Sequence, residues 1–185
     1  MKHLIMLLVC FAIFFAGNIY AQKSAKTTKF SSVYTNLNKD CKTVGGDDGQ
    51  DEAAYCRGIG GYKIYVGAAA SALAISIQTP EKEDIGDIPM QGFDYDTTKI
   101  NVEWRLANGK PFAVIIRIFK YSDEKANESD YFGKKIGEEL KIVGLKGFAG
   151  INFNVDAKTS GANLKARELA DNGYLKKMNN QGAEF

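Results

Sequence analysis

Alternation of apolar and polar residues is clearest in residues 100–121, which read INVEWRLANGKPFAVIIRIFKY. Two apolar-rich runs flank Asn108-Gly109, a dipeptide that strongly favours a β-hairpin turn. A two-residue turn would put Arg117 on the apolar face of Trp104, whereas a three-residue loop over 107–109, with Gly109 left-handed, avoids this. We therefore expect the second register, whose apolar face collects Ile100, Val102, Trp104, Leu106, Phe112, Val114, Ile116 and Ile118.

The opposite face of this hairpin is mixed, and it holds the candidate binding residues Glu103, Arg105 and Arg117. In one interpretation they form solvent-exposed cross-strand pairs of small energetic value. In the other they form a recognition surface, because arginine forks bind carboxylates and phosphates. Trp104 is expected in the core, and Tyr62 and Tyr65 stay open between core and ligand contact.

The remaining pattern predicts short strands and one helix. Strands are expected at 33–37, 62–66, 73–77, around Phe93 and Tyr95, and at 131–136, 140–143 and 148–155. The helix lies within 159–175, with Ser160 as its cap and Gly173 at its end, and its apolar stripe comprises Ala162, Ala166, Leu169 and Ala170. The fold class predicted is α+β, a mainly antiparallel β-sheet in a single domain with a C-terminal helix and one disulfide.

The N-terminus has the layout of a secretory signal peptide. Lys2 and His3 precede an apolar run from Leu4 to Ala16, and Ala21 supplies a small residue at the expected cleavage point. An uncleaved anchor is the alternative, although the run is shorter than the roughly 20 residues of a spanning helix. We expect a signal peptide at 1–21, a flexible arm at 22–30, a β-rich domain at 31–175 and a frayed tail at 176–185. A periplasmic or secreted location follows, with no transmembrane segment after cleavage.

Cys41 and Cys56 are the cysteines left after cleavage, since Cys10 lies in the signal. In an oxidising compartment two cysteines are most simply a disulfide, and their spacing fits neither a Cys-x-x-Cys redox centre nor a structural zinc site. The enclosed acids are Asp47, Asp48, Asp51 and Glu52. Their spacing does not match a calcium loop, so a solvated acidic loop is favoured over a calcium site. No metal and no cofactor is expected.

Charge and histidine content exclude several function classes. The formal net charge of +2 falls to about +1 on loss of Lys2, which does not suggest a nucleic-acid partner. His3 is the chain's single histidine, so the exported chain has no Ser-His-Asp or Cys-His nucleophile system. The catalytic arrangement that remains is a pair of carboxylates, and Glu103 with Asp94 or Asp96 would suit a glycan hydrolase.

Several short motifs carry a resemblance: Cys56-Arg57-Gly58 with Gly61-Tyr62, Val102-Glu103-Trp104-Arg105, Gly109-Lys110-Pro111-Phe112-Ala113 leading to Arg117, and Lys165-Ala166-Arg167-Glu168-Leu169-Ala170-Asp171. With Cys41, they resemble a family of small exported bacterial proteins of uncharacterised function, over residues 33–172. The resemblance implies a bacterial origin and export, and it brings no activity or ligand. The family's further cysteine in the later strands has no counterpart in LKGFAGINF.

These observations together favour a non-catalytic binding or interaction domain, although catalysis is not decided. Its expected partner is another envelope or secreted macromolecule, or a small anionic ligand. The histidine-free glycan hydrolase is the alternative.

Overall fold

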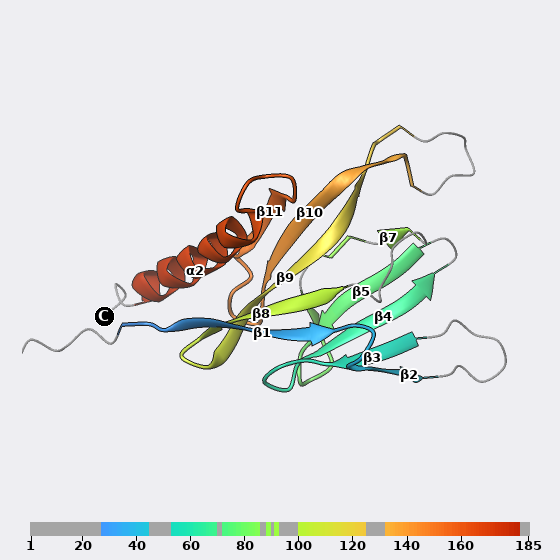
Figure 1. The fold of residues 1–185 in the computed structure, drawn as a ribbon. Coiled ribbons are helices and arrows are strands. Elements are labelled where there is room, and N and C mark those ends of the chain that lie inside the picture. Colours follow the sequence, from blue (N-terminus) through green and yellow to red (C-terminus); the bar gives the residue numbers. More distant parts are fainter. Residues whose placement is uncertain are drawn as a thin grey trace, which may run out of the picture.

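The computed structural model describes residues 27–44, 53–69, 72–85, 88–89, 91–92, 100–124 and 132–181, and within them the chain forms two antiparallel sheets and one helix (Figure 1). The first sheet, here the inner sheet, has the order β1-β8-β9-β10-β11. Its strands are β1 (Phe30–Asn36), β8 (Asn101–Ala107), β9 (Lys110–Tyr121), β10 (Lys135–Gly144) and β11 (Asn152–Asp156). The helix is α2 (Ala162–Gln181).

The second sheet, here the outer sheet, has the order β2-β3-β4-β5-β6, and β7 also pairs with β5. Its strands are β2 (Cys41–Val44), β3 (Ala53–Arg57), β4 (Lys63–Ala69), β5 (Ala72–Gln78), β6 (Asp84–Ile85) and β7 (Gln91–Gly92). Figure 1 shows the helix on one side of the inner sheet and the outer sheet on the other. The predicted class, mainly antiparallel β-sheet with a C-terminal helix, is confirmed.

Two apolar clusters hold these three layers together, because the inner sheet is apolar on both faces. Between the sheets, Trp104 and its hairpin neighbours pack against Cys56, Ile64 and Ile77 of the outer sheet. Beneath the helix, Ile115 and Ile142 pack against the buried face of α2. That face is made of small residues, Ala162, Ala166 and Ala170, as the helical stripe predicted.

The hairpin confirms the two predicted strands and most of the predicted apolar face, but not the predicted loop. Ala107 pairs with Lys110, so the turn has two residues, and Asn108 and Gly109 both have positive φ (50° and 81°). The register then shifts between Arg105 and Leu106, so that Trp104 pairs with Val114, and Val114, Ile116 and Ile118 share the face of Trp104 as predicted. The extra residue sits in the strand beside Pro111, because proline has no N–H to donate to the ladder.

This bulge reverses one side chain. Phe112 was expected on the Trp104 face, but it lies in the cluster beneath the helix, against Phe148 and Tyr174. The other predicted members of the Trp104 face lie between the sheets, from Ile100 to Ile118. A local irregularity that periodicity cannot reveal therefore changes the environment of one aromatic ring.

The helix differs from its prediction at both ends. Gly161 rather than Ser160 precedes the first helical residue, and the Gly161 carbonyl accepts the hydrogen bond of Lys165 N. At the other end α2 runs through Gly173 to Gln181, so residues 176–181 are helical rather than frayed. A Cβ on Gly173 would lie 2.7 Å from Ile151 Cγ1, so this glycine allows the helix to approach the sheet instead of ending it.

Other strands agree in part with the sequence analysis. The strands expected at 33–37, 62–66 and 73–77 correspond to β1, β4 and β5. Of the strand expected at 131–136, only residues 135–136 are strand, and they join the one expected at 140–143 in β10; Tyr131 lies outside the described residues. The last expected strand is shortened to β11. Phe93 and Tyr95 lie outside the described residues, whereas β2 and β3 were not predicted.

Candidate functional site

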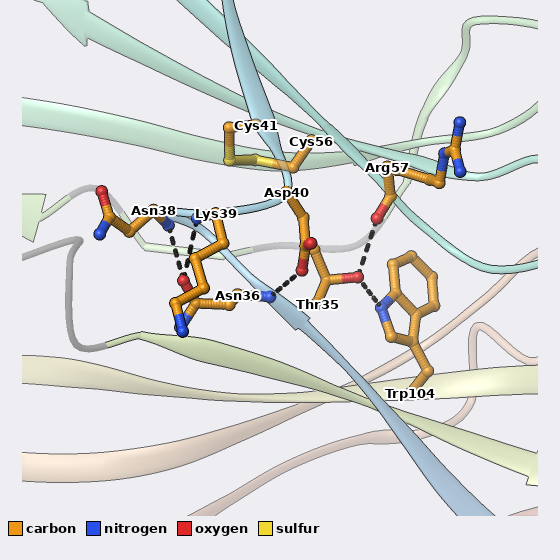
Figure 2. The surroundings of a disulfide bond; sticks show 9 residues. All are labelled: Thr35, Asn36, Asn38, Lys39, Asp40, Cys41, Cys56, Arg57 and Trp104. Carbon is orange, nitrogen blue, oxygen red and sulfur yellow. Dashed lines mark hydrogen bonds between the residues drawn. A yellow bond between two sulfur atoms is a disulfide. The ribbon is translucent and has the colours of Figure 1, made fainter.

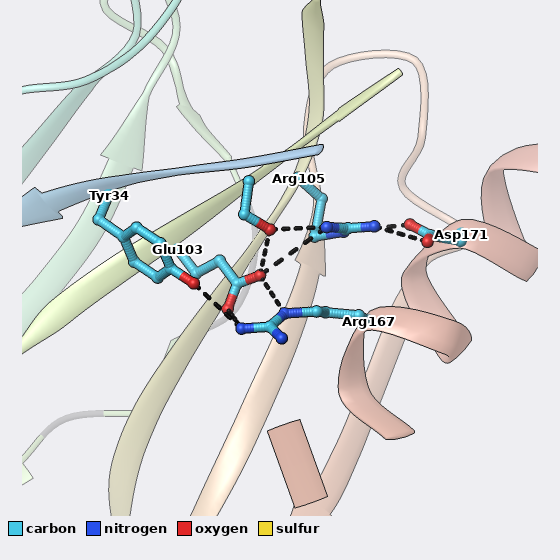
Figure 3. Close-up of polar contacts among 6 residues, drawn as sticks. Tyr34, Glu103, Arg105, Arg167 and Asp171 are labelled. Carbon is cyan, nitrogen blue, oxygen red and sulfur yellow. Dashed lines mark hydrogen bonds and ion pairs between the residues drawn. The ribbon is translucent and has the colours of Figure 1, made fainter. Parts of the chain in front are cut away.

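Glu103 and Arg105, two of the three predicted binding residues, lie beneath α2 instead of on an open sheet face (Figure 3). Glu103 is 7% exposed, and both of its carboxylate oxygens accept hydrogen bonds from Arg167, at 2.7 and 3.1 Å. These hydrogen bonds are the first cause of the raised pKa of Arg167, against which desolvation acts. Ser32 Oγ donates a further hydrogen bond to Glu103.

Arg105 is held in the same network. It is 6% exposed and donates two hydrogen bonds to Asp171 of α2, at 3.1 and 2.6 Å, and a third to Ser32 Oγ. Glu103 and Asp171 thus balance Arg105 and Arg167, and no buried charge in this network lacks a counterion. The arrangement ties the helix to the inner sheet, and its charges are committed to each other rather than to a ligand.

Arg117 lies apart from that network. Its side chain is exposed and contacts Glu138 at 3.4 Å. With Glu103, Tyr34 and Arg167 it lines a hollow of about 250 Å³, which Arg105 does not line. The structure therefore brings Glu103 and Arg117 to one small concavity, and it does not gather all three predicted residues into one site.

A larger hollow lies at the end of the outer sheet near the turn between β3 and β4. Its volume is about 770 Å³, within the range of small-molecule sites. We call it the basic hollow, and it is lined by Asp40, Lys42, Tyr55, Cys56, Arg57, Gly58, Gly61, Tyr62 and Lys63.

Strand alternation explains why polar residues reach this hollow. Cys56 and Ile64 pair across β3 and β4 and point into the core between the sheets. Their neighbours Tyr55, Arg57 and Lys63 therefore point to the opposite, outward face. Lys42 joins them, because it pairs with Tyr55. Three neighbouring strands thus present three cations and an aromatic ring to one side of the sheet.

The electrostatics of the basic hollow are unbalanced. Lys42, Arg57 and Lys63 are exposed, and none of them forms an ion pair in the part of the chain that the structure describes. Among the described lining residues there is one acid, Asp40, whose carboxylate accepts a hydrogen bond from Asn36 N at 2.6 Å. These three cations outnumber the one described acid, and the carboxylate of that acid is already hydrogen-bonded within the turn after β1. The charge of the hollow would therefore attract an anionic ligand.

The backbone under the basic hollow is fixed from three directions (Figure 2). The disulfide between Cys41 and Cys56 joins β2 to β3 at directly opposed positions, which confirms the predicted pairing. Thr35 Oγ1 donates to the carbonyl of Arg57 at 2.8 Å and accepts from Trp104 Nε1 at 2.9 Å. Arg57 N donates to the carbonyl of Asp40. These contacts hold in place the backbone from which the Arg57 side chain extends.

Sequence reasoning missed the cations of the basic hollow, although a signal for them existed. The segments Tyr55-Cys56-Arg57 and Lys63-Ile64-Tyr65 both place one apolar residue between two polar or aromatic ones. That is strand alternation, and the disulfide fixes which side is inward. Of the two tyrosines left open, Tyr62 packs near Trp104 and lines the hollow, and Tyr65 packs against Tyr55.

Two negative findings concern the described residues alone. Within those ranges, no three Asp, Glu, His or Cys side chains stand close enough to share a metal ion. In the same ranges, no helix combines the length and apolar character that crossing a membrane requires. The acids Asp47, Asp48, Asp51 and Glu52 lie outside the described residues, as do Asp94 and Asp96 of the hydrolase alternative.

Comparison with protein-family models, with curated proteins and with solved structures finds no match to this chain. The resemblance to small exported bacterial proteins therefore stays a prediction.

Proposed function

We propose that this protein is an exported, non-catalytic binding domain that holds an anionic ligand in the basic hollow. The observation that carries the proposal is the set of three exposed cations, Lys42, Arg57 and Lys63, around one concavity without ion-pair partners among the described residues. A ligand carboxylate or phosphate would supply the missing counterion, and the arginine fork would orient it. Tyr55 and Tyr62 add apolar contact beside these charges.

The exported location in this proposal rests on two separate observations. A disulfide persists in oxidising compartments, and the chain begins with a segment typical of a secretory signal. Mass spectrometry of the native protein should find Gln22 at the N-terminus and no free thiol at Cys41 or Cys56. An intact Met1 on a protein with free thiols would contradict export.

Ligand binding is tested by calorimetric titration with three probes: trigalacturonate, hexaglutamate and inorganic tripolyphosphate. At least one probe should bind saturably to the native protein. The Arg57→Gln/Lys63→Gln variant should weaken that binding at least fivefold, because each exposed cation contributes up to about 1 kcal/mol.

The matched control is Lys165→Gln/Lys176→Gln, which removes the same charge from exposed positions of α2, on the opposite side of the inner sheet. This control should bind like the native protein. Absence of saturable binding for all three probes, or equal weakening in both variants, would overturn the proposal.

A further inference from the structure

A second, smaller hollow adjoins the basic hollow on the outer sheet. It measures about 190 Å³ and is lined by Tyr55, Lys63, Gln78 and Lys82. Tyr55 and Lys63 line both hollows, so the two lie side by side on the outer sheet. We call the pair of hollows the cross-strand channel, and its lining extends from Lys42 on β2 to Lys82 between β5 and β6.

The cross-strand channel is mainly cationic in the part of the chain that the structure describes. Its lining residues there include four cations, Lys42, Arg57, Lys63 and Lys82, and one acid, Asp40. The acids near Lys82 have other partners: Lys146 lies 3.4 Å from Glu81 and 3.6 Å from Glu83, and Asp84 accepts from Ser76. Lys82 forms no ion pair within the described ranges. Arg57 and Lys63 are direct cross-strand partners on β3 and β4, and Lys82 lies beyond the next strand, so cations recur across the sheet. Such a recurrence matches a ligand that carries repeated negative charges.

Aromatic rings lie in the middle of this series. Tyr55 and Tyr65 are cross-strand partners whose ring centroids are 5.2 Å apart, and both rings are partly exposed. A partly exposed ring offers an apolar surface and a polar hydroxyl together. The amide of Gln78 at the second hollow can both donate and accept hydrogen bonds. Rings, an amide and cations together suit a ligand with apolar faces, hydroxyl groups and acid groups.

An extended peptide fits this surface less well than a glycan. Peptides that bind sheets add a strand at an edge, where backbone N–H and C=O groups are free. The cross-strand channel instead crosses the faces of β3 and β4, whose backbone groups are paired on both sides. A ligand here can meet side chains but cannot join the backbone ladder.

We propose that the cross-strand channel binds a linear acidic glycan, such as a polyuronate, with its chain lying across the strands. Carboxylates of successive sugars pair with Arg57, Lys63 and Lys82, and one sugar lies against Tyr55. This inference rests on the proposed function and adds the ligand class and a length requirement to it.

The test measures calorimetric affinities for galacturonate oligomers of two and six sugars, a methyl-esterified hexamer and hexaglutamate. The acidic hexamer should bind at least tenfold more tightly than the dimer, because two carboxylates cannot pair with Arg57, Lys63 and Lys82 together. Methyl esterification should abolish measurable binding, since it removes the charge and keeps the sugar. Lys82→Gln should weaken the hexamer about fivefold and leave the dimer unchanged. Tyr55→Ala should weaken both oligomers, with Tyr174→Ala as the control for loss of a ring.

The outcomes separate the two proposals. If hexaglutamate binds through Arg57 and Lys63 and no galacturonate oligomer does, the anionic-ligand function stands and the glycan inference is wrong. If the hexamer binds no better than the dimer, or if Lys82→Gln changes both equally, the channel is not used along its length and the inference is also wrong. If none of these probes binds, the glycan inference is wrong, and the proposed function also fails unless tripolyphosphate binds in the earlier titration.

Discussion

The guanidinium of Arg167 on α2 donates to both carboxylate oxygens of Glu103 on β8, 64 residues earlier in the chain. Figure 3 shows that Arg105 and Asp171 complete the set, so two ion pairs join the helix to the inner sheet. A sequence pattern that looked like a recognition surface is thus part of the packing between two layers.

Removal of one partner from this network should be costly. Glu103→Ala leaves Arg105 and Arg167 without their shared carboxylate, and we expect a loss of about 3 kcal/mol in the free energy of unfolding. Urea denaturation followed by circular dichroism measures it. Glu138→Ala, which breaks the exposed contact with Arg117, is the control and should cost less than about 1 kcal/mol. Equal losses in the two variants would contradict the structural role assigned to Glu103.

The disulfide should contribute to stability through the unfolded chain. Cys41 and Cys56 are 15 residues apart, and closure of a loop of that size stabilises by about 3 kcal/mol in the chain-entropy model. We expect Cys41→Ala/Cys56→Ala to lower the free energy of unfolding by about that amount. Dithiothreitol should destabilise the native protein similarly and leave the double variant unaffected. A reductant effect on the variant would mean that the loss has another cause.

Thr35 links the two layers of the sandwich through a single hydroxyl. It accepts from Trp104 Nε1 and donates to the Arg57 carbonyl, and it is 2% exposed. Thr35→Val keeps the shape and leaves a buried donor and an acceptor unpaired, so about 2 kcal/mol of stability should be lost. Thr43→Val, at an exposed position of β2, is the matched control. A shift in Trp104 fluorescence should accompany the first variant and not the second.

Gly173 should resist replacement even though it lies inside a helix. Alanine favours helices by about 1 kcal/mol over glycine, but its Cβ would lie 2.7 Å from Ile151 Cγ1. We expect Gly173→Ala to destabilise by about 1 to 2 kcal/mol, because the side chain of Ile151 is itself buried. Asn172→Ala, at an exposed neighbour, should be neutral or stabilising. In a double-mutant cycle, Ile151→Ala should reduce the cost of Gly173→Ala, and additivity would contradict the steric explanation.

Glu81 gives a prediction about pH. Its pKa lies below the ordinary value of 4.5, first because of a backbone hydrogen bond, then one with Thr79, with Lys146 a smaller cause. Since the folded pKa is depressed, any contribution to stability is present above pH 4.5 and lost as pH falls through the folded pKa. Carbon-13 NMR titration should show this lowered pKa. Lys146→Met should raise the pKa of Glu81 only part of the way back towards 4.5. A complete return to 4.5 would mean that the ion pair with Lys146 is the main cause of the lowered pKa.

The pattern of residues along the chain determined much of this protein. Apolar and polar alternation on either side of Asn108-Gly109 specified the hairpin and the inward position of Trp104. The expectation of export, together with the two cysteines left after cleavage, predicted their disulfide. The stripe of Ala162, Ala166 and Ala170 specified the buried helix face. These features depend on short-range periodicity and on residue counts, and a single sequence contains both.

Tertiary structure decided which face of each strand is covered, and by what. The face with Glu103 and Arg105 looked open because the residues that cover it, Arg167 and Asp171, come more than 60 residues later. The basic hollow forms because β2, β3 and β4 bring Lys42, Arg57 and Lys63 together on the side of that sheet that no described helix or sheet covers. Periodicity defines two faces for every strand, but only the packing of distant segments determines which of them meets water.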